Sequence, residues 1–280
     1  MTHTLELAHE RPDSNEAEVV RDFIAFLKEA SAARHPTGSM PRFNQGRAAG
    51  CVDATLTVAE SLDADLKVGL FAHAGTYQAR IRFAHASSAS DTERDVRGMS
   101  IKVRDVGGTN LTAGHHDQDF VLNSHPVMMV GDSRDFLDLL RANEAGGARR
   151  VLFFVTHPKA AAIALASRQH HSSPLEIPYF STTPFLFGDG RAVKYSVAPV
   201  ADTRTPLPDP LTADYLHDRL VSHLAEHDTA FDLRVQFQAH ALTMPIEDAS
   251  IEWSDKTSPW RTVARLQLPR QTVRRDDPCE

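Results

Sequence analysis

The N-terminal part of the chain has apolar residues at helical spacing. Val19, Phe23, Phe26 and Leu27 recur along one side of a segment that is otherwise polar. Asn15 followed by Glu18 resembles a helix-capping box, and a proline at position 36 would stop a helix. The pattern predicts an amphipathic helix over 15–33, in an N-terminal arm of residues 1–38, packed on the body of the protein or on a partner.

The next stretch favours strands and then helices. Short runs rich in β-branched and aromatic residues predict strands at 51–58, 78–86, 98–104 and 119–123, and Arg97 and Gly98 look like a tight turn. Apolar spacing then predicts a helix from about 132 to 143, ended by a glycine pair. A second helical stretch, 150–169, is interrupted near Pro158, and its apolar run 151–155 is expected to be core.

Strand character returns in the second half of the chain. Residues 178–199 resemble a hairpin around a Gly-Asp-Gly turn at 188–190, and a helix is expected at 211–227. Residues 231–239 alternate apolar and polar, and a last strand is expected at 262–268. About eight strands with helical insertions indicate an α+β protein: an antiparallel β-barrel, closed or nearly closed, with helices outside it, over residues 39–280.

Composition narrows the partners. The chain has 280 residues, 41% hydrophobic, and a net charge of −7, which argues against nucleic acid as the main partner. No apolar run reaches the 18 or so residues of a membrane span, and the polar N-terminus does not resemble a secretory signal. The two cysteines, Cys51 and Cys279, are too few for a disulfide framework, and we therefore expect a reducing, cytoplasmic setting.

Few motifs carry obvious chemistry. The sequence contains no nucleophile elbow or phosphate-binding loop, and its adjacent histidine pairs, 115–116 and 170–171, do not have the spacing of a metal site, so no metal ligands are predicted. Arg80 and Arg82 share one face of their strand, because side chains alternate along a strand. An outward face would be solvated, whereas a face inside the barrel would need an anion for each arginine.

Three segments resemble the catalase superfamily. They are RFAHAS from Arg82, DTERDVRGMSIKV from Asp91, and DFVLNSHPVMM from Asp119. The later segments FLFGDGRAVKYSVAP and MPIEDASIEWSDKTSPW are similar to the end of that family's barrel. The likeness covers about residues 40–270 and is strongest to small bacterial catalase-like proteins.

The resemblance implies a catalase-like barrel with a haem (heme) pocket at one side. It implies that Asn123 is the distal asparagine, that Arg82 pairs with a haem propionate, and that Phe136 lines the distal channel. Met128 stands where another aromatic usually lies. On this basis the arginine face is expected to point inward.

Two departures from the family pattern concern catalysis. Aligned on Gly50-Cys51-Val52, Gln45 stands where the family has its distal histidine, and an amide does not transfer protons near neutral pH. No tyrosine follows Tyr215, whereas the family takes its proximal iron ligand from a tyrosine after the barrel. Efficient peroxide disproportionation is therefore not expected.

Three functional hypotheses follow. In the first, haem with altered ligation supports peroxidase-like or hydroperoxide-rearranging chemistry, with Asn123 and Gln45 at the catalytic face. In the second, the pocket has no haem and serves a cyclase, an isomerase or a binding protein for a small acidic or polar molecule. Arg82 would then hold a carboxylate, while Asn123 and Gln45 orient a polar group. In the third, the chain is a structural subunit that pairs through the 15–33 helix. A small-molecule substrate and a homo-oligomer are the expected partners.

Overall fold

A computed structural model describes residues 6–35, 37–38, 42–108 and 114–274. The longer helices are α1 (Glu16–Arg34), α2 (Ser133–Ala145), α3 (Gly147–Thr156), α4 (Pro158–Ser167) and α5 (Tyr215–Glu226). Three short 3-10 turns are η1 (Ala64–Leu66), η2 (Gly69–Phe71) and η3 (Pro174–Glu176). The strands are β1 (Ala48–Val58), β2 (Gly75–His85), β3 (Arg97–Val103), β4 (Gln118–Asn123), β5 (Tyr179–Phe180), β6 (Phe185–Leu186), β7 (Ala192–Pro199), β8 (Thr229–Phe237) and β9 (Arg261–Leu268).

Eight strands close into an antiparallel barrel. They run in the order β5-β4-β3-β2-β1-β9-β8-β7, β5 pairs back to β7, and β6 is attached beyond β7. Closure depends on the two residues of β5, because Tyr179 pairs with Val197 and Phe180 pairs with both Asn123 and Ser196. The expected α+β barrel with helices outside it is confirmed.

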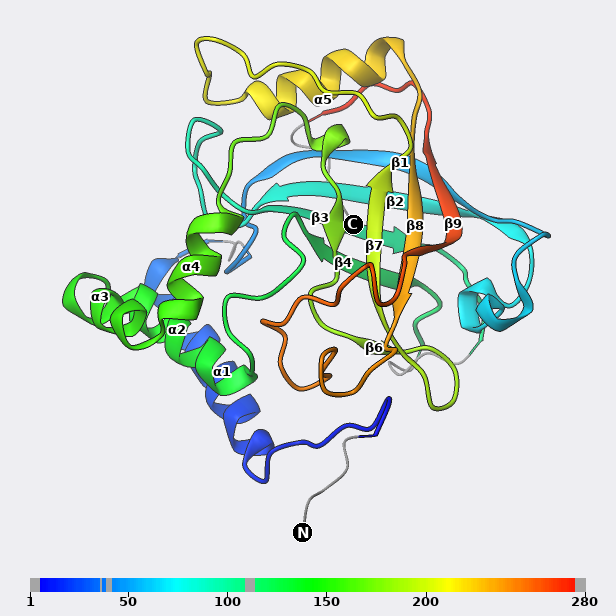
Figure 1. Ribbon diagram of the computed structural model, residues 1–280. Coiled ribbons are helices and arrows are strands. Elements are labelled where there is room, and N and C mark those ends of the chain that lie inside the picture. The colour runs from blue at the N-terminus through cyan, green and yellow to red at the C-terminus, as the bar shows by residue number, and fades with distance from the viewer. Residues whose placement is uncertain (1–5, 36, 39–41, 109–113, 275–280) are drawn as a thin grey trace.

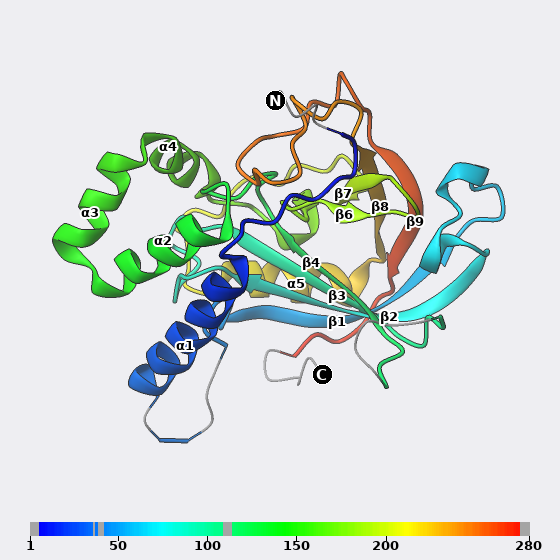
Figure 2. The ribbon, with the colours of Figure 1, turned by 90° about the horizontal axis from the view of Figure 1, so that it is seen from below.

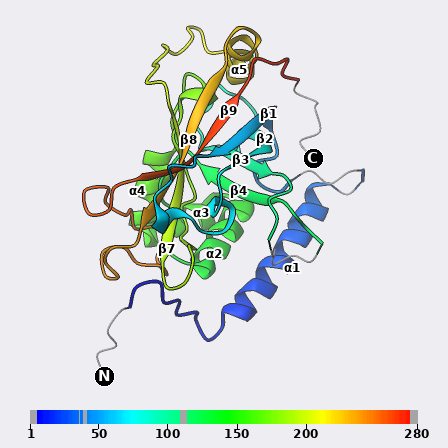
Figure 3. The ribbon, with the colours of Figure 1, turned by 90° about the vertical axis from the view of Figure 1, so that its right-hand side faces the viewer.

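Helices α1 to α4 gather at one side of the barrel, and α5 lies across one end (Figure 1). The view from below keeps α1 beside α2 and away from the β6–β9 side (Figure 2). Seen from the right-hand side, α5 again lies at the end of β8 and β9, remote from α1 (Figure 3). Gly50 allows α5 to approach β1 closely, because a Cβ there would lie 2.7 Å from Cδ2 of Leu220.

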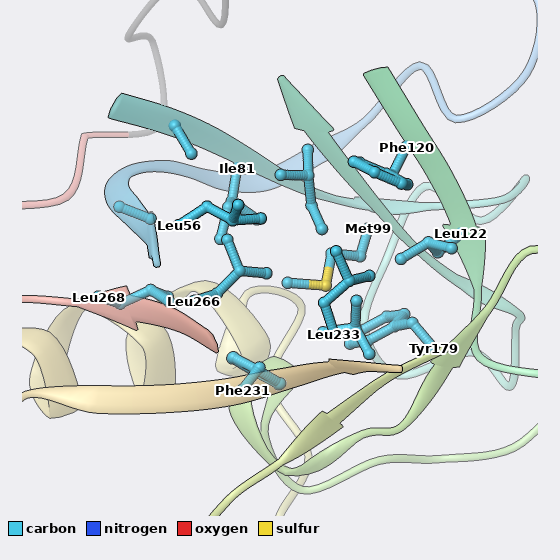
Figure 4. Close-up of a cluster of buried hydrophobic side chains, with 14 of the residues drawn as sticks. Leu56, Ile81, Met99, Phe120, Leu122, Tyr179, Phe231, Leu233, Leu266 and Leu268 are labelled. Atoms are coloured by element: carbon cyan, nitrogen blue, oxygen red, sulfur yellow. The ribbon is translucent and has the colours of Figure 1, made fainter. Parts of the chain in front are cut away.

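Alternation along the strands fills the barrel with apolar side chains. Leu56, Ile81, Met99, Phe231 and Leu266 point toward one another from five strands (Figure 4) and are almost completely buried. Such packing follows from a period of two, which sends every second residue to the interior. The interior is thus a packed core.

Helix α1 packs on the protein's own body. Its Phe23 ring stacks on Phe136 of α2 at 5.9 Å between centroids, and Phe26 meets Phe43 edge-on at 6.0 Å. Asn15 occupies the N-cap position, but its side chain makes no capping hydrogen bond. Both phenylalanines therefore have partners within the chain, and the homo-oligomer stays a prediction, as does the domain boundary at residue 38.

Two local expectations are wrong. Arg97 and Gly98 lie in β3 and do not form a turn. Of the apolar run 151–155, Val151, Leu152 and Val155 are exposed, since α3 contacts its neighbours mainly through Phe153. Cys51 is disulfide-bonded and Cys279 lies outside the described residues, and the reducing, cytoplasmic setting stays a prediction.

None of the helices in the described ranges combines the length and the apolar composition that a membrane span requires.

Candidate functional site

A cavity of about 500 Å³ lies on the outer face of β2, β3 and β4. The segment just before β1 forms its rim. The described residues that line it are Arg42, Asn44, Gln45, Arg80, Arg82, Ser100, Ile101, Lys102, Asp119, Phe120 and Val121. Four of these side chains are cationic and one is anionic, so the cavity has a positive character.

Arg82 points away from the barrel core and toward this cavity. Its neighbours Ile81 and Phe83 are in the core, so the alternation along β2 places Arg82 on the opposite face. The inward direction expected from the resemblance is therefore wrong: the side chain is outside the barrel, yet only 9% exposed, because the pre-β1 segment covers it. Nη2 of Arg82 donates to the carbonyls of Gln45, at 2.7 Å, and Gly46, at 3.2 Å.

Burial together with the lack of a carboxylate partner in the described part of the chain distinguishes Arg82 from the other cations of the cavity. Arg80 pairs with Asp53 at 3.1 Å and Lys102 with Asp119 at 3.0 Å. Among the described residues, Arg82 has no carboxylate partner. Burial, and then the positive charge of Arg42, lower the pKa of Arg82 to about 10.

Gln45 and Asn123 come together as a hydrogen-bonded amide pair. Nε2 of Gln45 donates to Oδ1 of Asn123 at 3.1 Å. Gln45 adopts a left-handed backbone with φ of 55°, and its N–H donates to the carbonyl of Ala86 at 3.1 Å. Gly98 makes room for the side chain, since a Cβ there would lie 2.7 Å from Nε2 of Gln45.

A buried charge network anchors the segment that carries Gln45. Nη1 of Arg47 donates to Oδ1 of Asp91 at 2.6 Å, and Nη2 donates to Asp214 at 2.6 Å. Asp91 also pairs with Nε2 of His85 at 3.0 Å and accepts from the N–H of Leu216, at the start of α5, at 2.7 Å. The segment is therefore held by Arg47, which binds Asp91 and Asp214, and by Arg82, which binds the carbonyls of Gln45 and Gly46.

The five predicted site residues separate into two groups. Arg82 and Gln45 line the cavity, and Asn123 contacts Gln45 directly. Phe136 and Met128 do not line the cavity. Phe136 stacks on Phe23, and the backbone N–H of Met128 donates to the carbonyl of Ala249. The aromatic partner from α1 was not foreseen, and it takes the face of α2 that was assigned to a ligand channel.

Sequence reasoning missed Arg42 and Val121 as cavity residues. Val121 stands two residues before Asn123 on β4, so the same alternation that relates Arg80 to Arg82 could have placed it on that face. Arg42 lies in a segment without regular structure, where no periodicity gives a direction. Among the described residues, no three His, Cys, Asp or Glu side chains gather as a metal site.

The class of protein is an antiparallel β-barrel with an outer layer of helices and a cationic cavity against its wall. Solved structures identify the particular fold as that of the catalases. A bacterial catalase matches with a TM-score of 0.68 and 18% identity, over 97% of this chain and 55% of that chain. A fungal catalase matches with a TM-score of 0.66 and 16% identity, over 97% and 57%. Catalase A from Saccharomyces cerevisiae matches with a TM-score of 0.68 and 15% identity, over 97% and 59%.

At these identities the likeness establishes the fold alone. The chain spans 55 to 59% of the length of these catalases. No protein-family model matches the sequence, and no curated protein matches it. The predicted catalase-like fold is confirmed, and the chemistry of the cavity has to be argued from its own residues.

Proposed function

We propose that the cavity on the outer face of β2, β3 and β4 binds the carboxylate of a small organic molecule, and that Arg82 receives it. The observation that carries this proposal is the environment of Arg82: the residue is 9% exposed, and its guanidinium has no carboxylate partner among the described residues. Carbonyl oxygens of Gln45 and Gly46 hold one of its nitrogens in place.

The energetics favour an anion at this position. A cation removed from water is costly unless it is paired, and two carbonyl contacts compensate only part of that cost. Arg42 adds a second positive charge, and its effect on the pKa of Arg82 indicates that the two repel each other. A carboxylate bound between them would relieve the repulsion and match the forked donors of arginine.

The catalase fold raises the question of haem, and the cavity fits it poorly. The side chains that ligate haem iron in proteins are His, Cys, Met and Tyr. None of these is among the described residues that line the cavity. Tyr179 is buried in the barrel, with its hydroxyl donating to the carbonyl of Pro174, and Tyr215 donates to the carbonyl of His171. An iron ligand would have to come from outside the described lining of the cavity.

Gln45 and Asn123 suit orientation better than acid–base chemistry. Their amides can donate and accept hydrogen bonds but do not exchange protons near neutral pH. They lie at the end of the cavity where Gln45 forms part of the wall. The proposal is therefore a binding function, with Arg82 fixing a charged group and the amide pair orienting a polar one.

Calorimetric titration with hexanoate tests the proposal. The unaltered protein should bind, Arg82→Gln should lose at least tenfold in affinity, and Arg82→Lys should retain part of it, because the charge remains and the fork is lost. Arg265→Gln is the matched control, since Arg265 pairs with Asp232 on the barrel surface, remote from the cavity. Equal affinity of the Arg82→Gln variant and the unaltered protein would reject the role of Arg82.

Haem carries carboxylates too, so a second arm separates the two sources. Haem is added to the purified protein and its Soret absorption is recorded with and without excess hexanoate. We expect no shifted Soret band of a ligated iron. A shifted band that Arg82→Gln weakens would favour the haem hypothesis over a free organic acid.

A further inference from the structure

A second cavity, of about 400 Å³, adjoins the first. The described residues that line it are Val68, Gly69, Leu70, Phe71, Gln118, Asp119, Phe120, Val121, Leu122, Ser181, Phe185, Leu186, Phe187 and Tyr195. Most of these side chains are apolar and five are aromatic. We call it the aromatic cavity, and the one at Arg82 the cationic cavity.

The aromatic cavity exists because the barrel wall is incomplete beside β4. On its β3 side β4 is paired along its whole length, whereas on the other side only Asn123 pairs, with Phe180. Among the described residues no strand pairs with 118–122 on that side. Aromatic side chains fill the gap instead: the ring of Tyr195 lies 5.2 Å from that of Phe120 and 5.7 Å from that of Phe185.

The two cavities meet at β4. Asp119, Phe120 and Val121 line both of them. Val121 is 61% exposed, and across the aromatic cavity Phe185 and Leu186 are 49% and 68% exposed. Large apolar side chains that gather in the open around a cavity commonly mark a binding site. The exposed surface of Val121 thus joins a positively charged compartment to an apolar one.

The one carboxylate on this shared wall does not oppose an anionic ligand strongly. Asp119 pairs with Lys102 at 3.0 Å, which offsets its charge. Arg42 and Arg82 therefore make the charge of the cationic cavity positive. The aromatic cavity contains no charged side chain other than Asp119 among its described lining residues.

We propose that the ligand is an amphipathic monocarboxylate, whose carboxylate binds at Arg82 and whose apolar chain crosses Val121 into the aromatic cavity. The inference rests on the proposed function, because it takes the carboxylate position from it. It adds the class of ligand: a molecule with one charged end and a flexible hydrocarbon or aromatic tail.

A homologous series of acids tests this inference. Burial of a methylene group contributes ~0.8 kcal/mol, or about a fourfold gain in affinity, and a half-buried chain would gain about twofold. Calorimetric affinities for butanoate, hexanoate and octanoate should therefore rise roughly two- to fourfold per methylene. Affinity that is independent of chain length would overturn the inference while leaving the carboxylate site intact.

Variants in the aromatic cavity give a second readout. Leu186→Ser and Phe185→Ser change half-exposed or exposed side chains and are expected to fold. Each should weaken octanoate at least fivefold and leave butanoate unchanged. Leu152→Ser is the matched control, since Leu152 is 62% exposed on α3 and distant from both cavities. An equal loss for both acids, or none for octanoate, would reject the path across Val121.

The failure of each proposal has its own signature. Octanol matches octanoate in length without the charge and should bind at least tenfold more weakly. Equal binding of octanol and octanoate, unaffected by Arg82→Gln, would remove the carboxylate site and with it the amphipathic ligand. If Arg82→Gln abolished the binding of all three acids, and the affinity of the unaltered protein did not depend on chain length, only the proposed position of the tail would be rejected.

Discussion

The side chain of Gln45 lies directly against the Cα of Gly98 and donates its amide hydrogen to Asn123 at 3.1 Å. The amide is therefore confined between a strand that has no side chain at that point and an asparagine at the end of the next strand. This arrangement makes the position of Gln45 sensitive to a single methyl group on β3.

Gly98→Ala should displace Gln45. A Cβ at this position would overlap the amide, and overpacking of this kind costs about 1–3 kcal/mol. We expect urea denaturation to give a lower free energy of unfolding by that amount. In the Gln45→Ala background the amide is absent, so the same substitution should cost much less. Additive effects in this double-mutant cycle would contradict the close packing of the two residues.

Substitutions at Gln45 itself should distinguish the contribution of its side-chain amide to stability from the cost of its backbone conformation. Gln45→Ala and Gln45→Gly both remove the hydrogen bond to Asn123, worth about 1 kcal/mol. Only glycine relieves the left-handed φ of 55°, which costs other residues about 1 kcal/mol. Gln45→Gly should therefore be the more stable of the two by about that amount in urea denaturation, and the reverse order would argue against this backbone conformation.

Asp91 should be among the most important polar residues for stability. It is fully buried and accepts hydrogen bonds from Arg47, His85 and the N–H of Leu216. Asp91→Asn replaces the buried carboxylate that pairs with Arg47 and accepts from His85, and we expect a loss of about 3 kcal/mol or more. Asp232→Asn, which breaks a surface pair with Arg265, should cost less than about 1 kcal/mol in the same denaturation experiment.

The acid side of the stability profile should also depend on Asp91. Burial alone would raise its pKa, but hydrogen bonds from His85 and Arg47 outweigh that effect and lower the pKa to about 2. Its stabilisation is therefore complete above the ordinary aspartate pKa near 3.9 and is lost as the pH falls toward 2. Thermal unfolding between pH 4 and 2 should show a flatter profile for Asp91→Asn; an unchanged slope would exclude this residue as the cause.

Between about pH 6.5 and 4 the dependence of stability on pH should reflect the titration of His171. Burial, and then the charges of Arg97 and His170, lower the pKa of His171 to about 4. The unfolded chain binds a proton near pH 6.5 that the folded chain does not bind, so stability falls as the pH drops from about 6.5 to 4. Burial also lowers the pKa of His85, which adds to the same trend. His171→Gln should reduce the slope of unfolding free energy against pH in this window without abolishing it.

Phe23 tests how α1 is held. Its ring stacks on Phe136, and aromatic pairs contribute about 1 kcal/mol beyond the area they bury. Phe23→Ala should make α1 more accessible to limited proteolysis while the barrel keeps its unfolding midpoint within a few degrees. Ile24→Ala, an exposed position on the same helix, is the control. Unchanged cleavage of α1 in Phe23→Ala would mean that other contacts hold it.

The barrel could be predicted because its strands have strong alternation. Residues 231–235 illustrate this, since Phe231, Leu233 and Val235 are all fully buried as expected. Periodicity places Arg80 and Arg82 on one face but does not say which face lies inside, and that direction was wrong. The same limit explains why the run 151–155 in α3 was wrongly expected to be core. An apolar run predicts a helix there but does not show which of its sides packs against a neighbour.

Within the site, residues on regular strands were easier to predict than residues on segments that other elements cover. The alignment on three residues of β1 assigned Gln45 to the same site as Asn123, and the two side chains are hydrogen-bonded in the structure. This assignment succeeded because the pairing of the strands fixes where the start of β1 and the end of β4 lie. Phe136 was misplaced because its environment depends on α1, which joins α2 from more than a hundred residues away. The aromatic cavity was not foreseen, since it results from the short β5 and the gap that β5 leaves beside β4.

The position of β1 has a consequence for synthesis. This strand pairs with β2, close by in sequence, and with β9, where Leu56 lies opposite Leu266. On a ribosome that adds 5–20 residues per second, β1 would wait about 10–40 s for that second neighbour. During that interval the inner faces of β1 to β4 are without the strands that cover them, a situation that favours slow folding and engagement by chaperones.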